Sequence, residues 1–127
     1  MKTIDVKFKK IEICNYSPRE TIMDIKITID NNGQEKQFLK KDKIGNPGDL
    51  ALYILSKMKK SIKEKSFDDE EGPLGGIVVV RLNDEEIIDK MTKFLSSVKD
   101  RINNIQRDKT ITYFRMAEKI NGMAMNF

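Results

Sequence analysis

Apolar and charged residues alternate along residues 3–14, which is the pattern of a β-strand with one buried and one solvated face. The alternation changes phase between Phe8 and Ile11, and an extra residue near Lys9-Lys10 would return both halves to one face. The pattern therefore predicts a strand with a β-bulge at that point. Residues 15–19 predict a turn, because asparagine, serine and proline favour turn conformations.

The most regular alternation spans residues 23–30, where methionine or isoleucine occupies every second position. An Asn-Gly pair follows at Asn32-Gly33, and this pair is typical of the two-residue loop of a tight hairpin. With that loop, Ile27 faces Phe38 across the two strands and both side chains lie on the core side. The first forty residues thus predict an antiparallel meander of three strands.

A polar connector at residues 40–45 separates this meander from a helix that is expected to begin at Asn46-Pro47. Asparagine caps free backbone N–H groups, and proline is favoured at the first helical position. The apolar face of this helix, with Tyr53 on its flank, comprises Leu50, Ala51, Ile54, Leu55, Met58 and Ile62. An acidic and glycine-rich loop is expected at residues 66–76.

A strand is expected at residues 77–82, because residues 77–80 form a continuous apolar, β-branched run that fits a strand covered on both faces. Asn83 then starts a helix, and the acidic residues 84–86 suit the positive end of its dipole. The helix is expected to reach residue 107, a length of about 36 Å at 1.5 Å per residue. Its apolar stripe consists of Ile88, Met91, Leu95, Val98, Ile102 and Ile105.

Two uses of this stripe fit its alternating spacing of three and four residues. A broad apolar stripe packs against a sheet of the same chain. A strict seam that is sustained over three heptads can instead join two copies in a coiled coil. The pattern therefore leaves open whether the stripe belongs to the core or forms a self-association face.

The C-terminal part of the chain is harder to interpret. Threonine, isoleucine, tyrosine and phenylalanine in residues 109–114 favour a strand, whereas residues 115–120 favour a helix that ends at Asn121-Gly122. We expect a helix that Asp108 caps, followed by a methionine-rich tail that docks on the core or on a partner. The elements predict one domain, residues 1–127, with an α+β fold. A mainly antiparallel sheet, in the order β-β-β-α-β-α-α, is packed on one face by two or three helices.

The composition excludes several classes of chemistry. The chain contains no histidine and one cysteine, Cys14, so Ser–His and Cys–His nucleophiles, histidine-ligated metals, thiolate zinc sites and an internal disulfide are ruled out. Cys14 lies in a strand pattern and is expected to be a buried, unreactive thiol. We expect no catalytic residue, no cofactor and no metal, and therefore a protein that is not an enzyme.

Two acidic clusters carry the remaining enzymatic hypothesis, in which carboxylates would act with a metal or a nucleotide. Residues 68–71 lack the ordered spacing of a calcium loop, and residues 84–86 are explained by the start of a helix. No apolar run is long enough for a membrane span, and the N-terminus reads as a charged strand rather than a secretory signal. We therefore expect a cytoplasmic protein that does not contact membranes.

The net charge of +4 is unevenly distributed, since residues 1–67 hold 15 of the 24 basic and 9 of the 20 acidic side chains. The residues that could contact an anionic partner are Lys57, Lys59, Lys60 and Lys63, with Lys40, Lys41 and Lys43 as additions. A solvated helix face is the simpler explanation of these lysines, because no stacking aromatic residues accompany them. The sequence thus predicts a small non-catalytic interaction protein that binds another protein, or itself through the long helix. The alternative is a nucleic-acid-binding module that uses the lysine-rich helix.

Overall fold

A computed structural model of the chain describes residues 2–31, 33–70, 78–81, 84–108 and 110–127, with side chains described at 7–30, 33–60, 84–108 and 110–127. The elements follow in the order β1 (Lys2–Ser17), β2 (Ile22–Asn31), β3 (Gln34–Asp42), α1 (Pro47–Glu70), β4 (Val78–Arg81), α2 (Asp84–Arg107), α3 (Tyr113–Ile120) and β5 (Ala124–Asn126). The predicted order is confirmed up to α3, and β5 is an addition that the sequence analysis missed.

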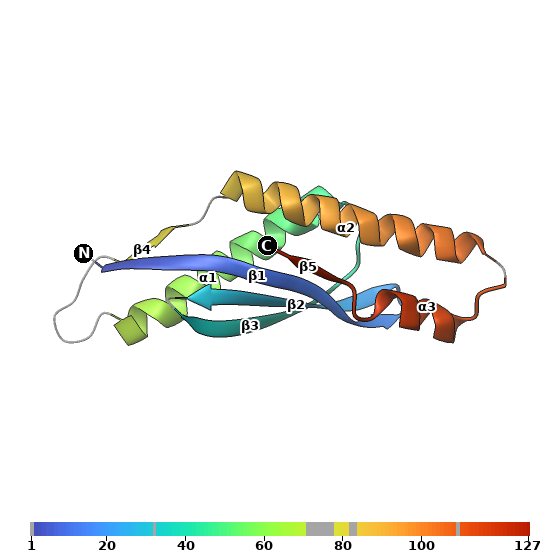
Figure 1. Cartoon of the computed structure of the whole chain (residues 1–127), viewed down its shortest axis with the longest axis horizontal. Helices are drawn as coiled ribbons and strands as arrows, with labels where there is room; N and C mark the ends of the chain where they lie inside the picture. Colours follow the sequence, from blue (N-terminus) through green and yellow to red (C-terminus); the bar gives the residue numbers. More distant parts are fainter. Residues whose placement is uncertain (1, 32, 71–77, 82–83, 109) are drawn as a thin grey trace.

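The strands form one sheet in the order β3-β2-β1-β4, and β5 pairs with β1 on the same side as β4. The pairs β1–β2, β2–β3 and β1–β5 are antiparallel, while β4 runs parallel to the first residues of β1. Helix α1 crosses one face of this sheet and α2 packs against α1 (Figure 1). The α+β fold with a mainly antiparallel sheet is therefore confirmed.

Strand β1 contains the expected bulge and one more. The register shifts once between Phe8 and Lys10, as predicted, and again between Ile13 and Asn15. The second shift keeps β1 in the sheet as far as Ser17 and places the buried Tyr16 opposite Met23. The turn predicted at residues 15–19 therefore begins later, because a bulge restores the inward phase without ending the strand.

The hairpin of β2 and β3 has the predicted register, with Ile27 opposite Phe38. Gly33 adopts a positive φ of 86° and its N–H donates to Asp30 Oδ1 at 2.7 Å, which closes the turn. Strand β3 continues to Asp42, so the first part of the expected polar connector is strand. Even-numbered residues of β3 share the side of Phe38 that faces the helices, and odd-numbered residues point to the outer face.

Helix α1 begins at Pro47, where the Asn46 side chain accepts hydrogen bonds from the N–H groups of Gly48 and Asp49 at 3.0 and 3.4 Å. This cap matches the prediction. The helix then extends to Glu70, so residues 66–70 are helical and the loop expected at 66–76 was wrong for that part. Residues 71–76 lie outside the described part of the chain. The buried residues of α1 are Leu50, Ala51, Ile54, Leu55 and Met58.

Helix α2 spans the predicted residues, Asp84 to Arg107. Of its apolar stripe, Ile88 is partly buried against the core and the buried members are Met91, Leu95, Val98, Ile102 and Ile105. The intramolecular use of the stripe is therefore supported, because the same core cluster contains residues of β1, β2 and α1. The Asn83 cap and the side chains of the preceding strand fall outside the described residues.

The C-terminal segment folds back onto the sheet. Helix α3 starts at Tyr113 after Thr112, so Asp108 does not cap it; Asp108 Oδ1 instead accepts from the Thr110 N–H and hydroxyl at 3.0 and 2.7 Å. Beyond Gly122, whose φ of 79° turns the chain, β5 pairs with Lys10–Glu12 of β1. Met116 is buried, and the partly buried residues of the tail that pack against the core are Met123, Met125 and Phe127. The tail thus docks on its own core.

The outer face of the sheet is polar and includes one buried hydroxyl. Thr28 of β2 is 1% exposed, and its Oγ1 has no hydrogen-bond partner among the described residues. Burial of an unpaired hydroxyl is unfavourable, and valine has the same shape with a high strand propensity. We expect Thr28→Val to raise the free energy of unfolding by about 1 kcal/mol in urea denaturation. Thr28→Ser, which keeps the hydroxyl and loses the methyl group, should lower the free energy of unfolding. A valine variant less stable than the parent chain would contradict the conclusion that the Thr28 hydroxyl is buried and unpaired.

Candidate binding surface

The lysines proposed from the sequence do not form one surface. Lys57 and Lys59 are two positions apart on α1, which places them on opposite flanks of the helix. The ammonium of Lys59 forms an ion pair with Asp84 at the start of α2. Lys57 lies on the flank next to β3, and Lys60, three residues further, shares that flank. The side chain of Lys63 is outside the described residues. The four predicted lysines therefore do not share one face: Lys57 and Lys60 lie on one flank of α1 and Lys59 on the other.

Lys57 and a lysine of β3 meet at an exposed tyrosine. The Nζ of Lys40 lies 4.3 Å from the centre of the Tyr53 ring and donates a hydrogen bond to its hydroxyl at 3.3 Å. The Nζ of Lys57 lies 5.5 Å from the same ring centre. The side chain of Tyr53 is 42% exposed, so the ring remains accessible beside the two cations. We call these three residues the Tyr53 cluster.

The charge of Lys40 is maintained in this cluster. Burial alone would lower the pKa of Lys40, but the hydrogen bond and electrostatic interaction with the Tyr53 hydroxyl and the carboxylate of Asp42 together outweigh it and raise the pKa. The Asp42 carboxylate lies 3.5 Å from the Lys40 ammonium. Lys40 is therefore a permanent cation at neutral pH, held at one position by two neighbours.

A small groove adjoins the Tyr53 cluster, between β3 and α1. It is lined by Phe38, Ile54 and Met58, together with Lys40 and Lys57, and its volume is about 100 Å³. Pockets for drug-sized ligands have volumes of about 300–1,000 Å³. The groove can therefore accept one apolar side chain of a partner rather than a whole small molecule.

Strand β3 also forms one border of the sheet (Figure 1). Its inner edge pairs with β2, and among the described strands none pairs with its outer edge. Leu39, near the middle of the strand, points to the outer face and is 67% exposed. An edge strand with open N–H and C=O groups is a template for pairing with another chain.

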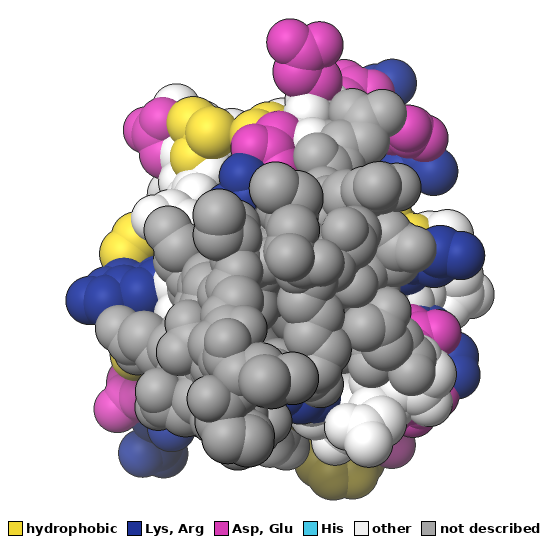
Figure 2. Space-filling model, turned by 90° about the vertical axis from the view of Figure 1, so that its left-hand side faces the viewer, with side chains coloured by type: hydrophobic (Ala, Val, Ile, Leu, Met, Phe, Trp, Pro, Cys, Tyr) yellow, Lys and Arg dark blue, Asp and Glu magenta, His cyan; other side chains and the backbone are white. Residues whose placement is uncertain are grey.

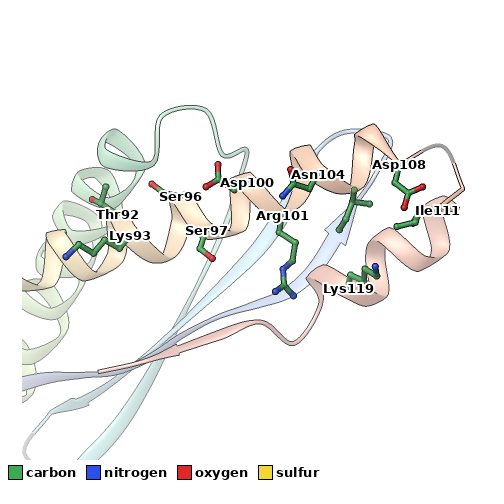
Figure 3. Close-up of a pocket in the computed structure, with 11 residues that line it drawn as sticks. Thr92, Lys93, Ser96, Ser97, Asp100, Arg101, Asn104, Asp108, Ile111 and Lys119 are labelled. Atoms are coloured by element: carbon green, nitrogen blue, oxygen red, sulfur yellow. The ribbon is translucent and has the colours of Figure 1, made fainter.

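A hollow in the described surface runs along α2 towards α3, with a volume of about 930 Å³. Its charged lining mixes Lys93, Arg101 and Lys119 with Asp100 and Asp108. Figure 3 shows that these side chains, from α2, α3 and the connection between them, point in different directions and do not converge on one point. The Asp108 carboxylate is already engaged by Thr110, whose hydrogen bonds lower its pKa. This arrangement provides neither a specific ligand site nor a nucleophile beside a base.

The acidic clusters are partly engaged in ion pairs. Asp84 pairs with Lys59, and the Glu86 carboxylate lies 3.5 Å from Lys90. Residues 68–71 have side chains outside the described part of the structure. Within the described part, no three Asp, Glu, Cys or His residues are close enough to hold a metal ion. On the end of the molecule shown in Figure 2, described acidic and basic side chains are interspersed around the rim.

Cys14 differs from the expectation of a buried thiol. It lies beside the second bulge of β1 and is only partly buried. Burial raises the pKa of the Cys14 thiol, and the negative charge of Glu12 adds to this effect. A thiol with a raised pKa is a weak nucleophile at neutral pH, so its proposed low reactivity has a physical basis other than complete burial.

Comparisons with protein-family models, with curated proteins and with solved structures found no significant match. None of the described helices is both long and apolar enough to cross a lipid bilayer. The candidate surface is therefore argued from this chain alone. The sequence did not predict the contact of Lys40 with Tyr53. The predicted hairpin register contained part of the signal, because Lys40 lies two residues after Phe38 and therefore also faces the helices.

Proposed function

We propose that this protein is a small non-catalytic interaction protein that binds an acidic segment of another protein at the Tyr53 cluster. The observation that carries the proposal is the convergence of Lys40 from β3 and Lys57 from α1 on one exposed aromatic ring. Two cations from separate elements give a localised positive charge that a partner carboxylate can pair with. The groove beside them accepts an apolar side chain next to that carboxylate.

The chemistry of this surface supports a non-catalytic role. Its polar groups are two ammonium ions and a phenol, and the nearest carboxylate, Asp42, is already paired with Lys40. Acyl or phosphoryl transfer requires an activated nucleophile or a positioned acid and base. The cluster therefore supports recognition of charge and shape rather than a chemical step.

Single-stranded nucleic acid is a second candidate partner, and the exposed ring of Tyr53 favours it. A base can stack on the ring while the neighbouring lysines contact phosphates, which is the mode of proteins that bind single strands. The sequence alone supplied lysines without an aromatic platform. The two candidates differ in what they require of Tyr53, because stacking needs an aromatic ring whereas pairing with carboxylates needs the lysines.

Fluorescence anisotropy at low salt, with two labelled probes of equal charge, tests both candidates. The probes are a short oligo-deoxythymidine and a glutamate-rich peptide with one central leucine. We expect Lys57→Gln to weaken binding of the recognised probe about tenfold. Lys59→Gln, which removes the same charge from the opposite flank of α1, is the matched control and should change affinity much less.

Tyr53→Leu separates the two partners. Loss of stacking should weaken the oligonucleotide about tenfold or more, and should leave the peptide nearly unchanged. If Lys57→Gln and Lys59→Gln weaken a probe equally, binding follows net charge and the Tyr53 cluster is not the site. If neither probe binds at low salt, recognition of an anionic partner here is wrong.

A further inference from the structure

We infer that two copies of this chain pair through the outer edges of their β3 strands. The strands run antiparallel about a two-fold axis at Leu39, and the two sheets become continuous. The inference rests on the outer edge of β3, which pairs with none of the described strands, and on the charges along it, and it is independent of the partner proposed for the Tyr53 cluster. It assigns self-association to β3 in place of the α2 stripe, which the core already covers.

The geometry of the sheet limits how two β3 strands can pair. Even-numbered residues of β3 face the helices and odd-numbered residues face outward. A two-fold axis perpendicular to the sheet keeps the helices of both copies on one side, so even residues must lie opposite even residues. This condition is met only when the axis passes through a residue, and each choice of residue fixes every cross-strand pair.

With the axis at Leu39, the charges along β3 are complementary. Lys36 lies opposite Asp42 of the second copy, and the pair occurs twice because the interface is isologous. Glu35 lies opposite Lys43, the residue that follows the strand. Within one chain Glu35 also pairs with Lys9 and Asp42 with Lys40, so the second copy would share these carboxylates. Opposite charges that face each other across antiparallel strands stabilise the pairing, whereas like charges destabilise it.

The neighbouring registers are less favourable. With the axis at Phe38, Glu35 would lie opposite Lys41, which is favourable. Lys36 would however lie opposite Lys40 of the second copy, and this like-charge pair would occur twice. With the axis at Gln37, Glu35 would face Leu39 and the charges would have no opposite partner across the strands. With the axis at Lys40, two lysines would meet on the axis itself. Only the register at Leu39 gives four opposite-charge pairs and no directly opposed like charges.

The same register accounts for the exposure of Leu39. Its side chain is 67% exposed in the single chain, and on the axis it would contact Leu39 of the second copy, with Cβ atoms about 4.5–5.5 Å apart. Both leucines would thereby lose contact with water. A single strand pair gives a small interface, so the dimer is expected to be weak and to form reversibly. It would also place both Tyr53 clusters on the same face of the joined sheet.

Cross-linking by cysteine tests the register directly, in a Cys14→Ser background. Leu39→Cys should form a disulfide-linked dimer under mild oxidation, because the two side chains meet on the axis. Gln37→Cys alone should not, but a mixture of Gln37→Cys and Lys41→Cys chains should link, since residue 37 lies opposite residue 41. Leu52→Cys, which is 52% exposed on α1, is the control for collisional cross-linking. Equal linking of Leu39→Cys and Leu52→Cys would overturn the inference.

Charge reversal tests the interface without a covalent bond. By sedimentation equilibrium, Lys36→Glu and Asp42→Lys should each weaken dimerisation about tenfold or more, and the two together should restore it. Circular dichroism checks that each variant remains folded. A chain that stays monomeric at high concentration, or a double variant as weak as the single ones, would overturn the inference. Lys57→Gln should leave the dimer intact, so dimerisation and binding of an anionic partner at the Tyr53 cluster are tested separately.

Discussion

Replacement of Leu95 by alanine is expected to lower the free energy of unfolding by about 3 kcal/mol. Leu95 is fully buried at the middle of α2, within a core that also contains Ile27 of β2 and Ile54 of α1. Truncation removes a buried isobutyl group and leaves a cavity that the surrounding sheet and helices fill only in part. Urea denaturation, followed by far-ultraviolet circular dichroism, measures the change.

Two comparisons give this result its meaning. Ile88→Ala, at the partly buried start of the same stripe, should cost clearly less than Leu95→Ala. Lys93→Ala, which is exposed on the opposite side of α2, should change stability by less than about 0.5 kcal/mol. If Leu95→Ala instead left stability unchanged and abolished self-association, the stripe would be an interface between copies and not part of the core.

The limits of α2 could be predicted because several local signals agree there. The apolar spacing, the acidic first turn and the preceding apolar run all indicate a helix over the same residues. The register of the β2–β3 hairpin was predictable for a similar reason, since the Asn-Gly loop and the alternation together allow one pairing. In both cases the determining interactions lie within a few residues along the chain.

The elements that were missed depend on contacts between distant residues. Strand β5 has three residues, too few to show an alternating pattern, and it exists because β1 offers an edge that β4 leaves open. The extension of α1 to Glu70 had only a weak local signal in the sequence. No helix-breaking glycine or proline occurs between Gly48 and Gly72. Acidic residues there suggested a loop, and the helix continues through them.

The candidate surface was predictable only in part. The lysines of α1 were visible in the sequence, but the division between Lys57 and Lys59 depends on how α1 packs between β3 and α2. That packing is set by the apolar residues of the helix, which fix its rotation relative to the sheet. Lys40 could have been placed beside α1 from the hairpin register, whereas its contact with Tyr53 required the crossing of strand and helix.

Removal of residues 123–127 is expected to lower the free energy of unfolding by about 3 kcal/mol, from about 1 kcal/mol for each partly buried apolar side chain that is lost. Met123, Met125 and Phe127 pack against the core, and the Phe127 ring lies 5.3 Å from the ring of Phe8. The deletion also removes the hydrogen bond from the Ile13 N–H to the Met123 carbonyl, 2.8 Å long. Urea denaturation and hydrogen exchange of β1 amides measure the effect.

The backbone pairing of β5 and the packing of its side chains can be separated with a matched variant. Ala124→Ser combined with Asn126→Ser changes only exposed positions of β5, so it should stay within about 0.5 kcal/mol of the parent chain. The deletion should expose the amide of Ile13 to exchange, because its carbonyl acceptor is gone. If the deletion costs no more than the double serine variant and Ile13 remains protected, β5 does not stabilise the sheet and its pairing partner, residues 10–12 of β1, is held by β2 alone.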